Sequence, residues 1–88
     1  MREIEIEREL KILANRRRLA IINLLRKRKE ASVGDRANTI KLSFTSTSKH
    51  LSMLERAGFL EKEQRSLEVY YRIAADSPRT YAALQAIF

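Results

Sequence analysis

The chain has 88 residues, enough for one domain with only a small core of its own. A hydrophobic fraction of 44% with 33% charged residues is typical of a folded chain rather than a disordered one. The net charge of +7 favours a polyanionic partner, nucleic acid before an anionic membrane surface. The absence of cysteine excludes disulfides and thiolate metal sites, and no apolar run approaches the roughly 20 residues of a membrane span. With no secretory leader, we expect a cytoplasmic protein.

The first 29 residues predict two helices. In the first, Arg2 to Leu13, apolar residues recur at helical spacing. Asn15 is expected to cap the second, which runs to about Lys29 and has a broad apolar face, so it should be the central core helix. Residues 11–29 hold eight cations and no acid, which makes this helix the main source of the positive charge.

The cations of the second helix fall into two groups. Arg16, Arg17 and Arg18 lie in its first turn, where they oppose the helix dipole. Either glutamates of the first helix pair with them, or they hold a DNA phosphate. The four residues 26–29 lie in the last turn, where cations suit the dipole, and a phosphate contact is again the alternative.

Residues 32–57 predict a helix-turn-helix. Ser32 to Asp35 fits a capping box that opens a short helix to about Lys41, and Ser43 then caps a helix that closes at Gly58. The core stripe of this last helix is expected to consist of Phe44, Thr47, Leu51 and Leu54.

The opposite face of the same helix carries short hydroxyl side chains around one lysine. Such a face can approach another surface closely, and the DNA major groove accepts a helix of this kind. Lys49 could donate to guanine O6 and N7 or contact a phosphate. His50 could pack against the following hairpin or reach a phosphate. The face consists of Thr45, Ser46, Ser48, Lys49 and Ser52.

The remainder predicts a β-hairpin and a final helix. The hairpin covers about residues 59–73, with a turn at 64–66 and an apolar face of Leu67, Val69, Tyr71 and Ile73. Tyr70 and Tyr71 alternate, so one should be buried and the other exposed. Ser77 followed by Pro78 predicts the start of a helix that runs to Phe88.

Three pieces of the chain, in order and at matching spacing, resemble the ArsR/SmtB type of winged-helix transcriptional repressor. They are LKILANRRRLAIINLL (10–25), LSFTSTSKHLSMLERAGFL (42–60) and VYYRI (69–73). The resemblance implies a single domain, 1–88, that is mainly α with a small β-hairpin: a winged helix-turn-helix with its helix-turn-helix at about 32–57 and its wing at about 59–73. It also implies a homodimer that binds double-stranded DNA at a pseudo-palindromic operator.

Site residues follow from the resemblance together with the reading of each face. The 43–57 helix is expected in the major groove, with the wing beside it and the helices at about 2–13 and 78–88 forming the dimer interface. The candidate DNA-binding residues are Ser43, Thr45, Ser46, Ser48, Lys49, His50, Lys62 and Arg65. The candidate dimer residues are Ile4, Ile6, Leu10, Tyr81, Leu84, Ile87 and Phe88.

The chain also departs from the resembled family. Ser32, Val33 and Gly34 stand where metal-sensing members carry a CVC motif, and His50 is the one histidine, so we expect no metal site and no cofactor. The wing is acidic at Glu61, Glu63 and Glu68, where basic residues are common.

Other function classes remain as alternatives. The chain lacks a cysteine nucleophile, a second histidine and a glycine-rich phosphate loop, so we do not expect an enzyme. The alternative to a DNA-binding regulator is a winged-helix interaction module that binds an acidic protein. RNA binding is less favoured because no aromatic stacking platform is evident. The operator, the regulated genes, any inducer and the choice between repression and activation stay open.

Overall fold

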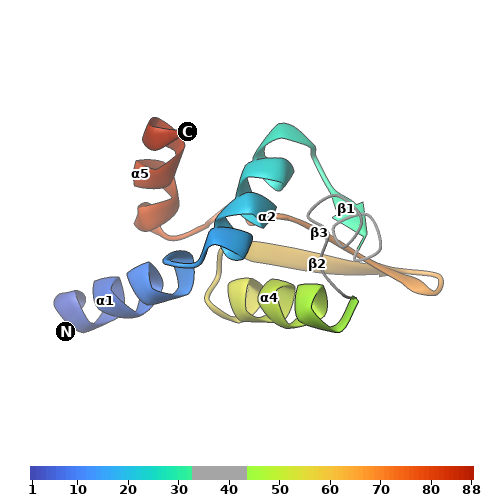
Figure 1. Ribbon diagram of the computed structural model, residues 1–88, viewed down its shortest axis with the longest axis horizontal. Coiled ribbons are helices and arrows are strands. Elements are labelled where there is room, and N and C mark those ends of the chain that lie inside the picture. Colours follow the sequence, from blue (N-terminus) through green and yellow to red (C-terminus); the bar gives the residue numbers. More distant parts are fainter. Residues whose placement is uncertain (33–43) are drawn as a thin grey trace.

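The computed structural model describes residues 1–32 and 44–88, and of residues 44 and 45 only the backbone (Figure 1). The predicted helix from Ser32 to about Lys41 and the cap at Ser43 fall largely outside these residues. The described elements are α1 (Arg2–Leu13), α2 (Arg16–Lys27), β1 (Ala31–Ser32), α4 (Phe44–Arg56), β2 (Leu60–Arg65), β3 (Glu68–Ile73) and α5 (Arg79–Ile87).

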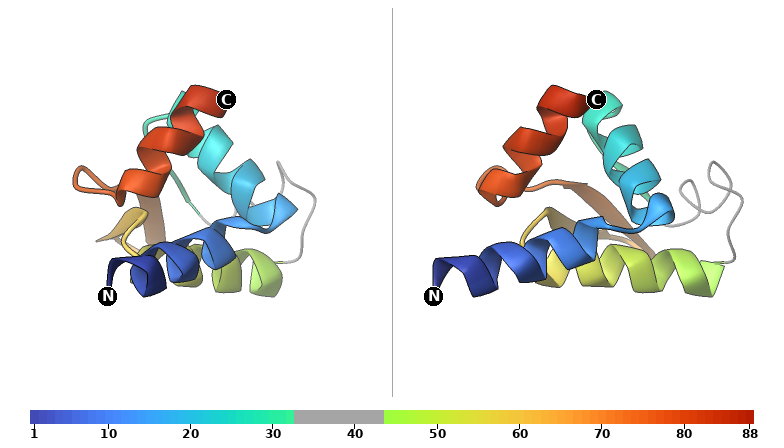
Figure 2. Two further views of the ribbon diagram at one scale, coloured as in Figure 1. Left: turned by 90° about the vertical axis from the view of Figure 1, so that its left-hand side faces the viewer. Right: turned by 60° about the vertical axis from the view of Figure 1, so that its left-hand side comes forward.

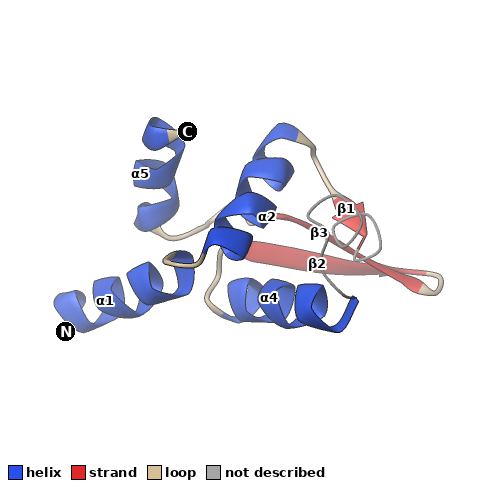
Figure 3. Cartoon of the chain, viewed as in Figure 1, coloured by secondary structure: helices blue, strands red, loops and turns tan. Residues whose placement is uncertain are grey.

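The strands form an antiparallel sheet of order β1-β3-β2, in which the hairpin of β2 and β3 predicted from the sequence is confirmed (Figure 3). The short edge strand β1 was not predicted; Ser32 is extended there, as an N-cap residue also is, and the helix expected to follow it lies outside the described residues. The two residues of β1 are buried and pair with the hairpin, Ala31 with Tyr71 and Ser32 with Tyr70. The strand forms because its backbone hydrogen-bonds to the edge of β3, where the partner of Ser32 lies 38 residues later in the sequence. Local sequence patterns do not show such a pairing.

The hairpin turn lies later than predicted, at Ser66 and Leu67, since Arg65 and Glu68 are the last paired residues. Ser66 has a φ of 55°, the positive value that two-residue hairpin turns require. Leu67 is 95% exposed, so its assignment to the apolar face was wrong. Val69 and Ile73 do pack against the core, and Tyr71 is buried beside them.

The core lies between α2, α4 and the sheet, which pack against one another. The buried stripe predicted for α4, the recognition helix expected in the major groove, is confirmed at Thr47, Leu51 and Leu54, none of which is exposed. Ile21 and Ile22 of α2 are equally enclosed, as expected of the central helix. The outer face of α4 therefore points away from the core.

Helix ends follow local chemistry. The Asn15 side chain accepts from the backbone nitrogens of Arg17 and Arg18 at 3.0 and 3.1 Å, which confirms the predicted cap of α2. At the end of α4, Gly58 has a φ of +90° and donates to Glu55, while Phe59 donates to Leu54. This pair of bonds is a Schellman motif, and it turns the chain sharply into β2.

Two helix boundaries differ slightly from expectation. α2 ends at Lys27, two residues early, with Arg28 as its extended C-cap. α5 starts at Arg79, and Pro78 occupies the N-cap position in place of Ser77, without a side-chain cap. Within residues 1–32 and 44–88, no helix is long and apolar enough to cross a membrane.

The first and last helices lie together at one end of the molecule, and the hairpin turn projects at the other (Figures 1 and 2). Thr80 Oγ1 on α5 donates to a carboxylate oxygen of Glu9 on α1 at 2.9 Å. The structure therefore brings the two segments of the expected dimer interface side by side.

Candidate nucleic-acid interface

The outward face of α4 forms a shallow hollow along the helix. Its lining residues recur at i, i+1, i+4, i+5 and i+8, the spacing of a single helical face. They are Ser48, Lys49, Ser52, Met53 and Arg56. This arrangement confirms that Ser48 and Lys49 share an accessible face, and it adds Met53 and Arg56, which the sequence reading did not single out.

The other recognition candidates have varied surroundings. Lys49 is exposed, and Ser46 and Ser48 are partly buried. Ser43 and the side chain of Thr45 lie outside the described residues. The accessible hydroxyls and the lysine match the donor and acceptor types that read base edges and phosphates.

His50 faces the start of α2 rather than the hairpin. Its Nδ1 accepts from Arg18 Nε at 3.3 Å. The same guanidinium donates from Nη1 to the carbonyl oxygen of Ile12 at 2.9 Å and from Nη2 to Sδ of Met53 at 3.2 Å. Of the two interpretations of His50, these contacts do not favour packing against the hairpin, and contact with a phosphate stays a prediction. Arg18 is committed to contacts within the protein.

The surroundings of His50 disfavour its charged form. Partial burial, followed by the positive charges of Arg18 and Arg17, holds the pKa of His50 below its ordinary value of 6.5. The imidazole is therefore neutral at pH 7, and it is a hydrogen-bonding group rather than a cation.

The two cationic groups of α2 lie at opposite ends of that helix. The helix begins beside α4 and rises away from it, so Arg16 and Arg17 are at the end near the recognition helix (Figures 1 and 2). Both are exposed, and none of the ion pairs in the described ranges involves either. Pairing with glutamates of α1, one of the two interpretations considered, is not what the structure has.

At the far end of α2, Arg26 is engaged within the protein. Its guanidinium donates to Asn23 Oδ1 at 2.8 Å and lies over the Phe88 ring, 5.2 Å from the centroid. Lys27, Arg28 and Lys29 are exposed there. Because this end points away from α4, the four cations do not extend the face of the recognition helix.

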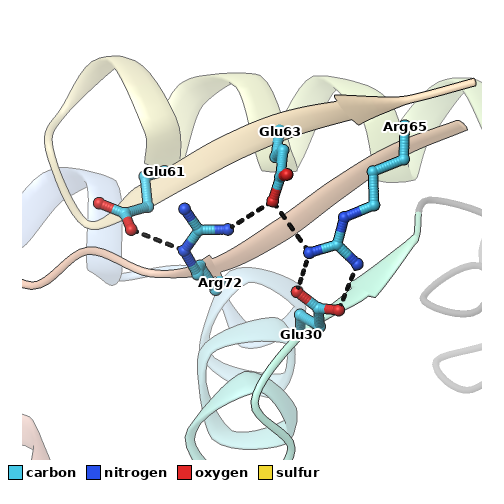
Figure 4. A network of polar contacts seen from close by, with 5 residues as sticks. All are labelled: Glu30, Glu61, Glu63, Arg65 and Arg72. Atoms are coloured by element: carbon cyan, nitrogen blue, oxygen red, sulfur yellow. Dashed lines mark hydrogen bonds and ion pairs between the residues drawn. The ribbon is translucent and has the colours of Figure 1, made fainter.

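The wing carries a chain of alternating charges (Figure 4). Arg65 on β2 contacts both carboxylate oxygens of Glu30 at 2.5 and 2.7 Å and reaches Glu63 at 2.9 Å. Arg72 on β3 bridges Glu63 at 3.2 Å and Glu61 at 2.6 Å. These bonds hold the pKa values of Glu30 and Glu63 below the ordinary value of 4.5 and raise that of Arg65.

This network changes the role expected of the wing cations. Arg65 is held by two carboxylates and lies over the Tyr70 ring at 4.6 Å, and Lys62 lies 3.9 Å from Glu55. Both candidates therefore have acidic partners within the chain. A phosphate would compete with these carboxylates for Lys62 and Arg65, and DNA contact by the wing stays a prediction.

The candidate dimer surface divides into exposed and buried members. Tyr81 is 8% exposed and belongs to the core of its own chain, and Leu84 packs against that core. These two side chains pack within their own protomer, beneath the exposed apolar residues, and are not available for contact with a partner. The exposed members are Ile4, Ile6, Leu10, Ile87 and Phe88.

Metal ligands do not gather in the described parts of the chain. Across those residues, no three His, Cys, Asp or Glu side chains form a group that could hold an ion. The charged side chains of the wing instead satisfy one another.

Comparison with known proteins places the chain in a family. Residues 15–62 match the model of the bacterial regulatory protein arsR family. The chain is 35% identical over 66 residues, 75% of its length, to the transcriptional activator HlyU of Vibrio cholerae, and 34% identical over 84 residues, 94% of its length, to the HTH-type transcriptional regulator Rv0324 of Mycobacterium tuberculosis. These matches cover 60% and 37% of the two relatives.

A solved structure agrees with the fold. The homodimeric winged helix-turn-helix DNA-binding domain of Mb0332 from Mycobacterium bovis superposes with a TM-score of 0.81 at 34% identity, covering 94% of this chain and 77% of that one. The family model spans α2, α4 and the start of the wing, the elements that carry the candidate interface. This chain is thus a winged helix-turn-helix protein of the arsR family of bacterial regulatory proteins.

Proposed function

We propose that the protein is a sequence-specific DNA-binding transcriptional regulator that binds a pseudo-palindromic operator as a homodimer, with α4 in the major groove. The observation that carries the proposal is the outward face of α4, which presents Lys49 and short hydroxyls, while the exposed Arg16 and Arg17 stand in the first turn of α2, the end of that helix nearer to α4. Hydroxyls and lysine can read base edges, and the neighbouring arginines can hold the flanking phosphates.

Assembly into a homodimer is supported by the apolar surface of α1 and α5. An exposed set of large apolar residues on two packed helices is typical of a protein–protein contact. The related domain from Mycobacterium bovis is homodimeric, and two recognition helices about 34–36 Å apart can read successive major grooves. We expect repression by occupation of a promoter, although the relative HlyU is named an activator.

The test is selection of duplex DNA from a random pool, followed by a salt titration of the selected duplex against a scrambled one. A regulator of this kind gives a selected sequence with two-fold symmetry and a preference of at least about 1000-fold over scrambled DNA. Equal binding to both duplexes, with tighter binding to an acidic polypeptide such as polyglutamate, would instead establish the protein-interaction alternative.

A further inference from the structure

The guanidinium of Arg18 is the point at which α1 and α4 are tied together. Its three nitrogens donate to the backbone carbonyl of Ile12, at the end of α1, and to the side chains of His50 and Met53, which lie one turn apart in α4. A planar fork with fixed donor directions suits this task, whereas a lysine ammonium cannot reproduce its geometry. Arg18 of α2 thus links α1 to α4, in addition to the packing of α4 against α2 and β2.

The same contact determines the protonation of the His50 ring. Since Nδ1 accepts from Arg18, it carries no hydrogen, and the neutral imidazole must carry its proton on Nε2. The charged groups that act on the ring, Arg17 and Arg18, both come from α2 and both disfavour the imidazolium. From α1 the Ile12 carbonyl accepts from Arg18, and Arg8 lines a hollow together with Met53.

The Nε2–H group has no acceptor within the described ranges of the chain, while Nδ1 is occupied. His50 directly follows Lys49 on the helix that carries the candidate interface, and it is only partly buried. An oriented neutral donor next to an exposed cation is suited to an acceptor on DNA, either a phosphate oxygen or a base edge.

We propose that Arg18 is a positioning residue for DNA binding, which sets α4 against α1 and holds His50 as the tautomer whose Nε2–H donates to DNA. This inference rests on the proposed function, and it adds two residues with different tasks. Arg18 acts through His50 and touches no DNA itself.

The first test compares two amides at position 50, measured on the duplex selected from the random pool. Asparagine places its Oδ1 where Nδ1 lies, so His50→Asn keeps the acceptor for Arg18 but loses the distal donor. Glutamine extends to the position of Nε2, so His50→Gln keeps the donor. Since His50→Gln also loses the acceptor for Arg18, we expect it to bind more weakly than wild type but more tightly than His50→Asn, which should lose about tenfold or more. Equal affinities, or tighter binding by His50→Asn, would overturn the role of Nε2–H.

The second test reads the ring directly in the unchanged protein. Because His50 is the one histidine in the chain, its imidazole nitrogens give a single set of ¹⁵N NMR signals. We expect the Nε2–H tautomer at pH 7 and a titration midpoint below 6.5. An Nδ1–H tautomer, or an imidazolium at pH 7, contradicts the inference and leaves the proposed function standing. If wild-type protein selects no DNA, the proposed function fails, whatever the tautomer.

The third test uses Arg18→Lys, which keeps the charge and removes the fork. We expect DNA affinity to fall by about tenfold while the slope of affinity against salt is unchanged, because no phosphate contact is lost. A purely structural role predicts a lower unfolding temperature with wild-type affinity at temperatures where the variant is folded. That outcome, or a shallower salt slope, would overturn the positioning role.

Discussion

Arg65, in the last position of β2, holds Glu30 through two parallel nitrogen–oxygen contacts, although the two residues are 35 positions apart. Glu30 directly precedes β1, so this fork-to-fork pair fastens the entry of the edge strand to the wing (Figure 4). Glu63 continues the contact to Arg72, and the hairpin thereby neutralises its own cations. The charged side chains of the wing therefore pair with one another.

The wing network predicts a loss of stability in acid. The pKa values of Glu30 and Glu63 are lowered by Arg65, so their contribution to stability is present above about pH 4.5 and is lost as pH falls through the lower folded values. Urea unfolding of wild type and Glu30→Gln between pH 7 and 3 measures this. We expect a difference in unfolding free energy that is constant above about pH 5 and shrinks towards zero at lower pH. A difference that grows in acid would show that the pair opposes folding.

Lys49 and Lys62 offer a matched pair of charge removals. Lys49 is exposed on α4, whereas Lys62 on the wing lies near Glu55. We expect Lys49→Ala to weaken binding to the selected duplex by about 1–3 kcal/mol and to relax preference at one base position. Lys62→Ala removes the same charge and should have a much smaller effect. Fluorescence anisotropy with the selected duplex and single-base variants decides it, and equal losses in the two variants would remove Lys49 from direct readout.

These comparisons also indicate what the sequence could reveal. The stripe of Thr47, Leu51 and Leu54 and the cap at Asn15 depend on neighbours within one or two turns, and both were predictable. Leu67 was assigned wrongly because strand alternation was extended into a turn residue.

The partners of the site depend instead on contacts between distant segments. Arg18 meets His50 across 32 positions, and Ser32 pairs with Tyr70 across 38. Composition and periodicity identify a cation or a short polar residue, but they do not say what it meets. For the same reason the sequence could not show that Arg65, a candidate for DNA contact, meets Glu30.

Arg16 and Arg17 are expected to set the salt dependence of binding. They are exposed at the end of α2 near α4, and the charge of Arg17 acts on His50 of that helix. If each holds a phosphate, changing both to glutamine should flatten the slope of log affinity against log salt by about 1.8 per protomer, with sequence preference unchanged. The control is Lys27→Gln with Arg28→Gln, which removes two charges at the far end of the same helix. Equal changes in slope for the two double variants would mean that overall charge, and not position, governs binding.

We expect the protein to bind its operator as a dimer, because a single recognition helix contacts too few base pairs to specify an operator. Thr80 and Glu9 fix α5 against α1, and Ile6 and Ile87 are exposed on these two helices, Ile87 by 79%. Burying an isoleucine stabilises a contact by about 1.5–3 kcal/mol, whereas a buried unpaired carboxylate opposes it strongly.

Ile6→Glu combined with Ile87→Glu should therefore give monomers and a large loss of operator affinity, although neither position lies on α4. Leu67→Glu is the control, since Leu67 is at least as exposed but lies at the opposite end of the molecule, on the hairpin turn (Figure 1). It should leave the dimer intact, and sedimentation at micromolar concentration measures all three proteins. If the double variant remains a dimer, the dimer interface does not include Ile6 and Ile87. If the wild-type protein is a monomer and still binds a palindromic duplex tightly, dimer formation is not required for operator affinity. Each recognition helix would then bind its half-site independently of the other.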